Sequence, residues 1–178
     1  RFRESLPVGC PYVQAWQGHC RLRRRVSIRQ SGYVDAPLTY GIIHPVILLP
    51  KSTDWTDIER LNYVLEHELA HILHFDAAAK LALTAAVCVH WFNPLVWLML
   101  SLANRDMELC CDEAVVRRFG ADSRPAYART LIAMEERRCG LGPFASSFSR
   151  NAIEERIRAI MKMRKRSLAA VLAAVLLV

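Results

Sequence analysis

Apolar residues follow two different periodicities along the chain, and the change between them lies near residue 50. Short apolar runs separated by Gly and Pro occupy residues 1–50 and predict strands. Residues 44–50 form such a run, and the proline at its end is typical of an edge strand. From Thr56 onwards apolar residues recur at helical spacing. We therefore expect an α+β fold, mainly α with a small N-terminal β-sheet, strand-rich over residues 1–50 and helical over residues 56–166.

Helix boundaries can be placed from local signals. Thr56-Asp57-Ile58-Glu59 has the spacing of a capping box, and Asn93-Pro94 has the form of an N-cap followed by proline at the first helical position. Gly120 is expected to end the helix that begins there. These signals and the apolar spacing predict helices over residues 58–75, 77–92, 94–119, 124–138 and 151–166, with a loop over residues 139–150.

The candidate chemistry begins with the H-E-x-x-H pattern of His67, Glu68 and His71, which falls inside the first predicted helix. On a helix the two histidines lie one turn apart on one face, where they can share a tetrahedral Zn²⁺ with Glu68 beside the open position. In a chain of this length and composition, about 0.01 matches to the pattern are expected by chance, so a false-positive match is improbable. The alternative is two solvent-facing histidines on an ordinary helix.

A third zinc ligand is needed. The metzincin pattern would require Gly at position 74 and His at position 77, and the chain has His74 and Ala77 instead. Downstream, Glu108 and Asp112 are spaced to share a helix face, with Arg105 on the same side. Glu108 can be the third ligand while Asp112 accepts a hydrogen bond from a ligating histidine. The alternative is a solvated charge cluster.

Zinc binding by both His71 and Glu108 constrains the chain between them. Residues 81–104 contain no Lys, Arg, Asp or Glu, a pattern that alone would indicate a membrane span. A straight crossing would place the two ligands on opposite sides of the bilayer, so the chain must turn back, and Asn93-Pro94 is the break. We expect a helical hairpin with Trp91, Phe92 and Trp97 near its tip, either packed in the core or dipped into the inner leaflet.

The formal net charge of +7 is concentrated at the two ends of the chain, so direct binding of nucleic acid is not expected. The chain starts at Arg1, and Lys162, Arg164, Lys165 and Arg166 precede an apolar run over residues 168–178. A basic cluster before an apolar run is typical of the cytoplasmic flank of a membrane span. We expect a cytoplasmic domain over residues 1–166 and the start of a truncated transmembrane helix over residues 167–178; the alternative is a buried C-terminal helix.

Several of these stretches together resemble the cytoplasmic metalloprotease domain of the bacterial BlaR/MecR-type antirepressor family. They are residues 44–50, 67–71, 91–97 and 108–112, with weaker agreement at residues 126–127 and 151–157. The resemblance implies a gluzincin-like zinc metalloendopeptidase with Zn²⁺ on His67, His71 and Glu108 and with Glu68 as the catalytic residue.

The same resemblance implies a location and a substrate. The catalytic domain would lie on the cytoplasmic side of the cell membrane, in contact with membrane lipid, and would cleave a protein substrate such as a DNA-binding repressor, in a β-lactam response. Self-cleavage is expected within residues 139–150. We expect the peptide substrate to lie along the strand at residues 46–49. Arg105 or a nearby histidine is a candidate for stabilising the oxyanion.

Two alternatives stay open from the sequence. One is another membrane gluzincin, of the prenyl-protein or heat-shock type, which shares the H-E-x-x-H pattern and a distal E-x-x-x-D. The other is a non-catalytic module that transduces a signal by protein contact, although its motif would be expected to be broken. The sequence does not indicate an oligomeric state.

Overall fold

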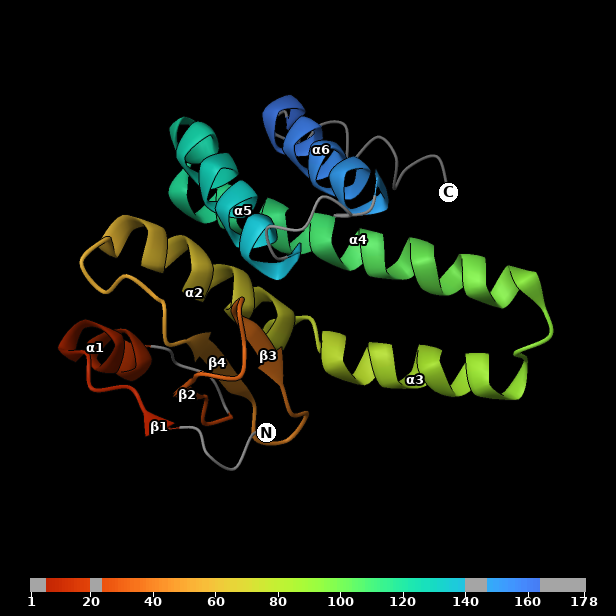
Figure 1. The fold of residues 1–178 in the computed structure, drawn as a ribbon, viewed down its shortest axis with the longest axis horizontal. Helices are drawn as coiled ribbons and strands as arrows, with labels where there is room; N and C mark the ends of the chain where they lie inside the picture. The colour runs from red at the N-terminus through yellow and green to blue at the C-terminus, as the bar shows by residue number, and fades with distance from the viewer. Residues whose placement is uncertain (1–5, 20–23, 140–146, 164–178) are drawn as a thin grey trace, which may run out of the picture.

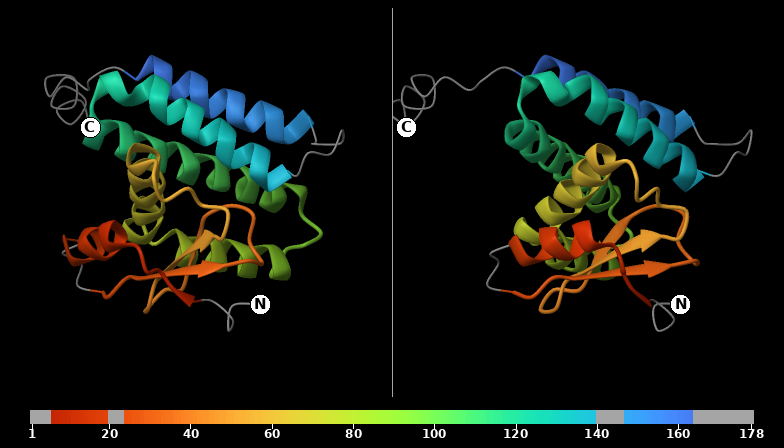
Figure 2. Two further views of the ribbon diagram at one scale, coloured as in Figure 1. Left: turned by 60° about the vertical axis from the view of Figure 1, so that its left-hand side comes forward. Right: turned by 90° about the vertical axis from the view of Figure 1, so that its left-hand side faces the viewer.

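The computed structural model describes residues 6–19, 24–139 and 147–163, which form a small sheet and a larger helical part (Figures 1 and 2). The helices are α1 (Pro11–His19), α2 (Ile58–Leu73), α3 (Asp76–Val89), α4 (Pro94–Phe119), α5 (Arg124–Cys139) and α6 (Ser147–Lys162), with a short 3₁₀ helix at Ala121–Ser123. The predicted α+β class is confirmed. Helix α1 was not predicted, because residues 1–50 as a whole were expected to be strand-rich, and its nine residues show no strong helical period.

The sheet consists of β1 (Leu6–Pro7), β2 (Ser27–Ser31), β3 (Leu38–Tyr40) and β4 (Val46–Pro50), in the order β1-β2-β4-β3. Strand β4 therefore lies inside the sheet, parallel to β2 and antiparallel to β3. The expectation that residues 46–49 form an edge strand is wrong. Its prolines lie at the two ends of the run, so the N–H groups between them remain available to both neighbouring strands. The outer strand on this side is β3.

Helix α2 lies between the sheet and the helices α4, α5 and α6, and it contributes to two apolar cores (Figure 1). Leu61, Val64 and Leu65 pack with the strands and α1 in one core. Tyr63, on another face of the helix, packs with residues of α4, α5 and α6 in the second. A helix covered by two layers is buried around most of its circumference, which explains why polar residues of α2 such as Glu68 are removed from solvent.

The start of α2 differs from the predicted capping box. Asp57 is the N-cap, and its side chain accepts a hydrogen bond from the backbone N–H of Arg60 at 3.0 Å. Thr56 instead donates its hydroxyl to Asp54, at 2.7 Å. Aspartate and threonine both cap helices, so the sequence pattern allowed either residue.

Helices α3 and α4 form the predicted hairpin and extend side by side away from the sheet (Figure 1). Asn93 caps α4 by accepting a hydrogen bond from the backbone N–H of Leu95 at 3.0 Å, with proline at the first helical position, as predicted. Trp91 and Phe92 at the turn are each 69% exposed, so the tip is not packed in the core. The second half of α4 returns to the body and packs on α2 and α6.

The chain bends sharply between α2 and α3 at Phe75, whose backbone is in the left-handed region with φ 59°. Arg24 supports this bend. Its guanidinium donates a hydrogen bond to the carbonyl of Ile72 at 2.7 Å, near the end of α2, and lies 3.9 Å from the centroid of the Phe75 ring. Capping of the last carbonyls by arginine offsets part of the cost of the unusual conformation.

Within the described residues, none of the helices by itself has the length and apolar composition of a membrane span. The pair α2 and α3 reaches that length and composition together, with a bend of 56° between them.

The connection between β3 and β4 depends on Gly41, which has φ 89°. A Cβ atom at this position would lie 2.5 Å from the carbonyl oxygen of His44, whereas a Cβ atom at Gly120, with φ 91°, would meet nothing within 4 Å. We expect Gly120→Ala to lose about 1–3 kcal/mol of unfolding free energy from backbone strain alone. Gly41→Ala should lose more, because the clash adds to the strain. Urea unfolding would measure both, and equal losses would contradict the clash.

Candidate metal centre

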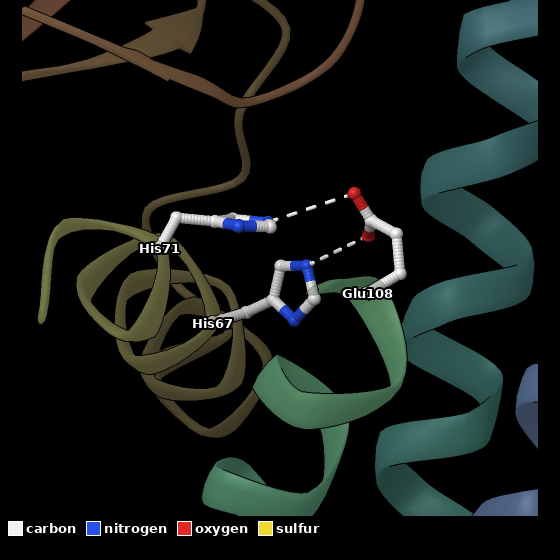
Figure 3. Close-up of side chains that lie close together, drawn as sticks. All are labelled: His67, His71 and Glu108. Carbon is white, nitrogen blue, oxygen red and sulfur yellow. Dashed lines mark ion pairs between the residues drawn. The ribbon is translucent and has the colours of Figure 1, made fainter. Parts of the chain in front are cut away.

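Helices α2 and α4 bring His67, His71 and Glu108 together (Figure 3). Nε2 of His67 lies 3.5 Å from Oε2 of Glu108, and Nε2 of His71 lies 3.8 Å from Oε1 of the same carboxylate. The two imidazole rings are nearly perpendicular, with centroids 4.9 Å apart. The sequence predicted that both histidines lie on one face of α2. In the structure α4 returns from the hairpin and places Glu108 beside them.

The spacing of these three donors fits a zinc ion. Ligand atoms about 2.1 Å from a tetrahedral Zn²⁺ are separated from one another by roughly 3.4 Å. The two nitrogen–oxygen distances are close to this value, and all three donors lie within 4.8 Å of one another. Two imidazoles and one carboxylate are also the donor set of a catalytic rather than a structural zinc site, since one coordination position stays open.

His67 is held by a hydrogen bond that fixes its tautomer. Its Nδ1 lies 2.9 Å from the hydroxyl of Tyr127, and this hydroxyl donates its only proton to Oδ1 of Asp112 at 2.7 Å. The hydroxyl can therefore only accept from His67, so Nδ1 carries the ring proton. The Nε2 lone pair, which a metal ligand requires, then faces Glu108 and lies 3.5 Å from Nη2 of Arg156.

Asp112 was expected to accept a hydrogen bond from a ligating histidine. In the structure Asp112 Oδ1 lies 3.5 Å from His67 Nδ1, and the Tyr127 hydroxyl connects the two groups. Asp112 is fully buried. Burial and the neighbouring Asp112 carboxylate raise the pKa of Tyr127 well above its ordinary value, which keeps the hydroxyl protonated. Sequence reasoning did not assign a role to Tyr127, although it lies in a stretch that supported the family resemblance.

His71 has a different outer partner, Asp76, in the first turn of α3. The distance between His71 Nδ1 and Asp76 Oδ2 is 2.6 Å, and Asp76 is buried. A carboxylate accepts, so His71 also carries its proton on Nδ1 and directs Nε2 towards Glu108. The spacing of five residues gave no signal in the sequence, because the turn at Phe75 brings Asp76 back to the histidine.

Cys111 fills the space behind this pair. Its Sγ lies 3.2 Å from His71 Nδ1 and 3.6 Å from Asp76 Oδ2. Burial and the Asp76 carboxylate raise the pKa of the Cys111 thiol, so it remains protonated at neutral pH. The thiol therefore acts here as a small buried side chain rather than as a thiolate ligand.

The arginine at the site is Arg156 of α6 and not Arg105. Arg156 donates from Nε and Nη2 to the two oxygens of Asp112, each at 2.7 Å, and its Nη1 lies 3.1 Å from Oε2 of Glu108. Arg105 is 48% exposed and pairs with Glu155 outside the site, because position 105 on α4 faces α6 rather than α2. Spacing within one helix indicated Arg105, whereas the arginine that contacts Asp112 and Glu108 lies on a helix about 50 residues further along the chain.

Charges around Glu108 set its ionisation. Burial opposes the charged form, but the neighbouring His67 and the charge of Arg156 outweigh it and lower the pKa of Glu108 below its ordinary value. Burial likewise disfavours charge on Arg156, while its hydrogen bonds to Asp112 raise its pKa. Glu108 is therefore a carboxylate at neutral pH, the form that binds a metal.

Glu68 lies beside the three donors and lines the same cleft, which has a volume of about 150 Å³. Its Oε2 accepts a hydrogen bond from the hydroxyl of Thr39 at 2.6 Å. Thr39 lies on β3, the outer strand, so this strand forms one wall of the cleft while Leu131 and Met134 of α5 contribute to another. The expectation that substrate lies along residues 46–49 is therefore corrected: β3 separates β4 from the cleft.

Comparison with known proteins relates most of the chain to one protein family. The profile of the family described as BlaR1 peptidase M56 matches residues 8–160. The regulatory protein BlaR1 of Bacillus licheniformis is 32% identical over 112 residues, which are 63% of this chain and 19% of that protein. The methicillin resistance mecR1 protein of Staphylococcus aureus is 22% identical over 111 residues, 62% of this chain and 19% of that protein. The match thus spans about a fifth of the length of these relatives.

The hydroxyl of Tyr127 can be removed with little change in shape. We expect Tyr127→Phe to weaken zinc binding by about 10–100-fold, because His67 loses the partner that fixes its ring. Tyr63→Phe is the matched control, since Tyr63 lies in the same core and its hydroxyl donates to Glu59 away from the site. Competition with a zinc chelator measures both affinities. Equal zinc affinities in the two variants would contradict the positioning role.

Proposed function

Because the chain belongs to the BlaR1 peptidase M56 family, we propose that it is a zinc metalloendopeptidase of the gluzincin type, with Zn²⁺ on His67, His71 and Glu108. The observation that carries the proposal is the convergence of the three donors, with each histidine held by its own hydrogen-bonded partner. Bound Zn²⁺ would supply a Lewis acid that polarises a water molecule and the scissile carbonyl.

The residues of the chain have separate tasks in this proposal. Glu68 accepts the proton of the attacking water and transfers it to the leaving amine nitrogen. Thr39 orients the Glu68 carboxylate from the outer strand, at 2.6 Å. Tyr127 holds the His67 ring, and Arg156 holds Asp112 and Glu108 in place. We propose that an extended peptide adds to the edge of β3, the strand whose Thr39 hydroxyl binds Glu68.

The biological role is also a proposal. The resemblance and the relatives named BlaR1 and mecR1 favour a regulatory protease that cleaves a cytoplasmic protein, a DNA-binding repressor, in response to β-lactams. Membrane attachment on the cytoplasmic side is favoured by the basic residues that precede the apolar run at residues 168–178. That run, and the proposed boundary between residues 166 and 167, lie outside the described residues.

Substitutions on α2 and α4 test the catalytic assignment. Glu68→Gln should keep about one zinc per molecule and lower casein hydrolysis by about 10²–10⁴-fold, because an amide cannot accept the proton. Glu66→Gln is the matched control: Glu66 is buried on the same helix but pairs with Trp16 and Arg118 away from the zinc donors. His67→Ala, His71→Ala and Glu108→Ala should each lose zinc in elemental analysis.

Each outcome separates one assignment from another. Full zinc in Glu108→Ala would mean that the third ligand lies elsewhere. Undiminished turnover in Glu68→Gln would remove Glu68 from its role. A wild-type chain that holds zinc and cleaves nothing would favour a non-catalytic transducing module.

Self-cleavage remains a prediction for the segment between α5 and α6. Helix α6 begins at Ser147, earlier than expected, and residues 140–146 lie outside the described residues. We expect zinc-dependent cleavage within residues 139–150, because a segment between two helices is where proteases nick a chain. Mass spectrometry of wild type and Glu68→Gln would detect a fragment that ends there in the wild type alone. The same fragment in both would point to a contaminating protease.

A further inference from the structure

The outer part of the α3–α4 hairpin, residues 81–102, exposes large apolar side chains on both arms. We refer to these residues as the hairpin tip. Its exposed members are Leu81, Val89, Trp91, Phe92, Leu95, Trp97, Leu98, Met99 and Leu102. No Lys, Arg, Asp or Glu occurs among them or anywhere between residues 81 and 104. We infer that the hairpin tip inserts into one leaflet of a lipid bilayer.

The exposure surrounds the first turns of α4 rather than following one stripe. Leu95, Leu98 and Leu102 lie on one face, while Trp97 projects to the other side of the same helix. A helix that docks in a protein groove presents a single apolar stripe and keeps polar residues on its outer face. A helix that exposes apolar side chains around its whole circumference suits the hydrocarbon of a lipid bilayer, which surrounds it on all sides.

Apart from the exposed imidazole of His90, the polar groups at the turn for which partners are described are satisfied within the hairpin. The N–H of Asn93 donates to the carbonyl of His90 at 2.9 Å, and the Asn93 side chain accepts from Leu95 N–H at 3.0 Å. The indole N–H of Trp97 donates to the carbonyl of Trp91 at 2.8 Å. On α3 the hydroxyl of Thr84 donates to the carbonyl of Lys80 at 2.7 Å. Insertion therefore costs few hydrogen bonds to water, which is the main restriction on backbone in lipid.

Length and charge favour one leaflet. The helical part of each arm within the tip has nine residues, Leu81 to Val89 and Pro94 to Leu102, or roughly 13 Å at 1.5 Å per residue. One leaflet contributes about 15 Å of hydrocarbon. Lys80 and Arg105 are the nearest charged residues along the two arms, where anionic headgroups would lie.

Insertion to this depth would place the metal centre just outside the membrane. Asp76 is five residues from Leu81 and Glu108 is six residues from Leu102, so both lie roughly 8–9 Å from the inserted part. On the proposed function, the scissile bond of a substrate would then be bound close to the membrane surface.

The four tryptophans permit a local test. Trp91 and Trp97 lie in the hairpin tip, whereas Trp16 and Trp55 are half-buried against the core formed by the sheet, α1 and α2. The 178-residue chain is mixed with phosphatidylglycerol/phosphatidylcholine vesicles that carry bromine on the acyl chains, which quenches indole fluorescence on contact. We expect quenching in the wild type and in Trp16→Phe/Trp55→Phe, and its loss in Trp91→Phe/Trp97→Phe.

A charge at the tip provides the second variant. Leu95→Glu should lose most of the quenching, because a carboxylate is costly in hydrocarbon. Ile43→Glu is the matched control, since Ile43 is 73% exposed and lies outside the hairpin. Both positions are on the surface, so circular dichroism should show folded protein in each case.

Three results would overturn the inference. Vesicle binding without quenching would mean that the chain is attached elsewhere, such as through residues 168–178. Quenching that persists in Trp91→Phe/Trp97→Phe would mean that a surface other than the hairpin tip contacts the lipid. If Leu95→Glu changes the sedimentation of the free protein but leaves the quenching unchanged, the hairpin tip would bind a second copy of the chain instead of lipid. Zinc content and casein turnover are measured without vesicles, so their failure would count against the proposed function alone.

Discussion

Four helices meet at the carboxylate of Asp112. This group, on α4, is fully buried, and it accepts hydrogen bonds from Tyr127 on α5 and from Arg156 on α6, while Tyr127 in turn contacts His67 on α2. Removing one member of such a buried pair typically costs 3–5 kcal/mol, because the remaining charge has no partner. Replacing such a buried set by apolar residues of similar volume is often neutral or stabilising in proteins. On the proposed function, the network serves to position His67 rather than to stabilise the fold.

The same network makes the metal donors depend on the tertiary fold. His67 and His71 share one helix, but their ring orientations are set by α5 and by the first turn of α3. Glu108 depends on α6 through Arg156. The site would thus be assembled only when the hairpin has closed and the last two helices have packed, which links metal affinity to folding.

Sequence reasoning succeeded where the determinants are local. The H-E-x-x-H pattern, the Asn93-Pro94 turn and the stop at Gly120 each follow from neighbouring residues, and the hairpin followed from requiring His71 and Glu108 to meet. It failed where partners come from distant elements. Thr39, Asp76 and Arg156 reach the site through a strand, a left-handed turn and the last described helix, and no spacing rule relates them to the motif. Strand β4 was misplaced because terminal prolines restrict a strand less than internal ones.

Helix α4 is continuous from the exposed tip to the buried centre, and this continuity has a mechanical consequence. Its 26 residues form a rod of about 39 Å that is held most firmly near Asp112. Pro94 lies 18 residues from that point and Glu108 only four, or roughly 27 Å and 6 Å. A rod pivoting there would move Glu108 by about a fifth of any sideways displacement of its outer end. A push of roughly 4 Å at the far end would shift the carboxylate by close to 1 Å, several times the tolerance of about 0.2 Å in a metal–ligand distance. The helix would therefore act as a reducing lever, through which a force at its outer end sets the fit of the third ligand.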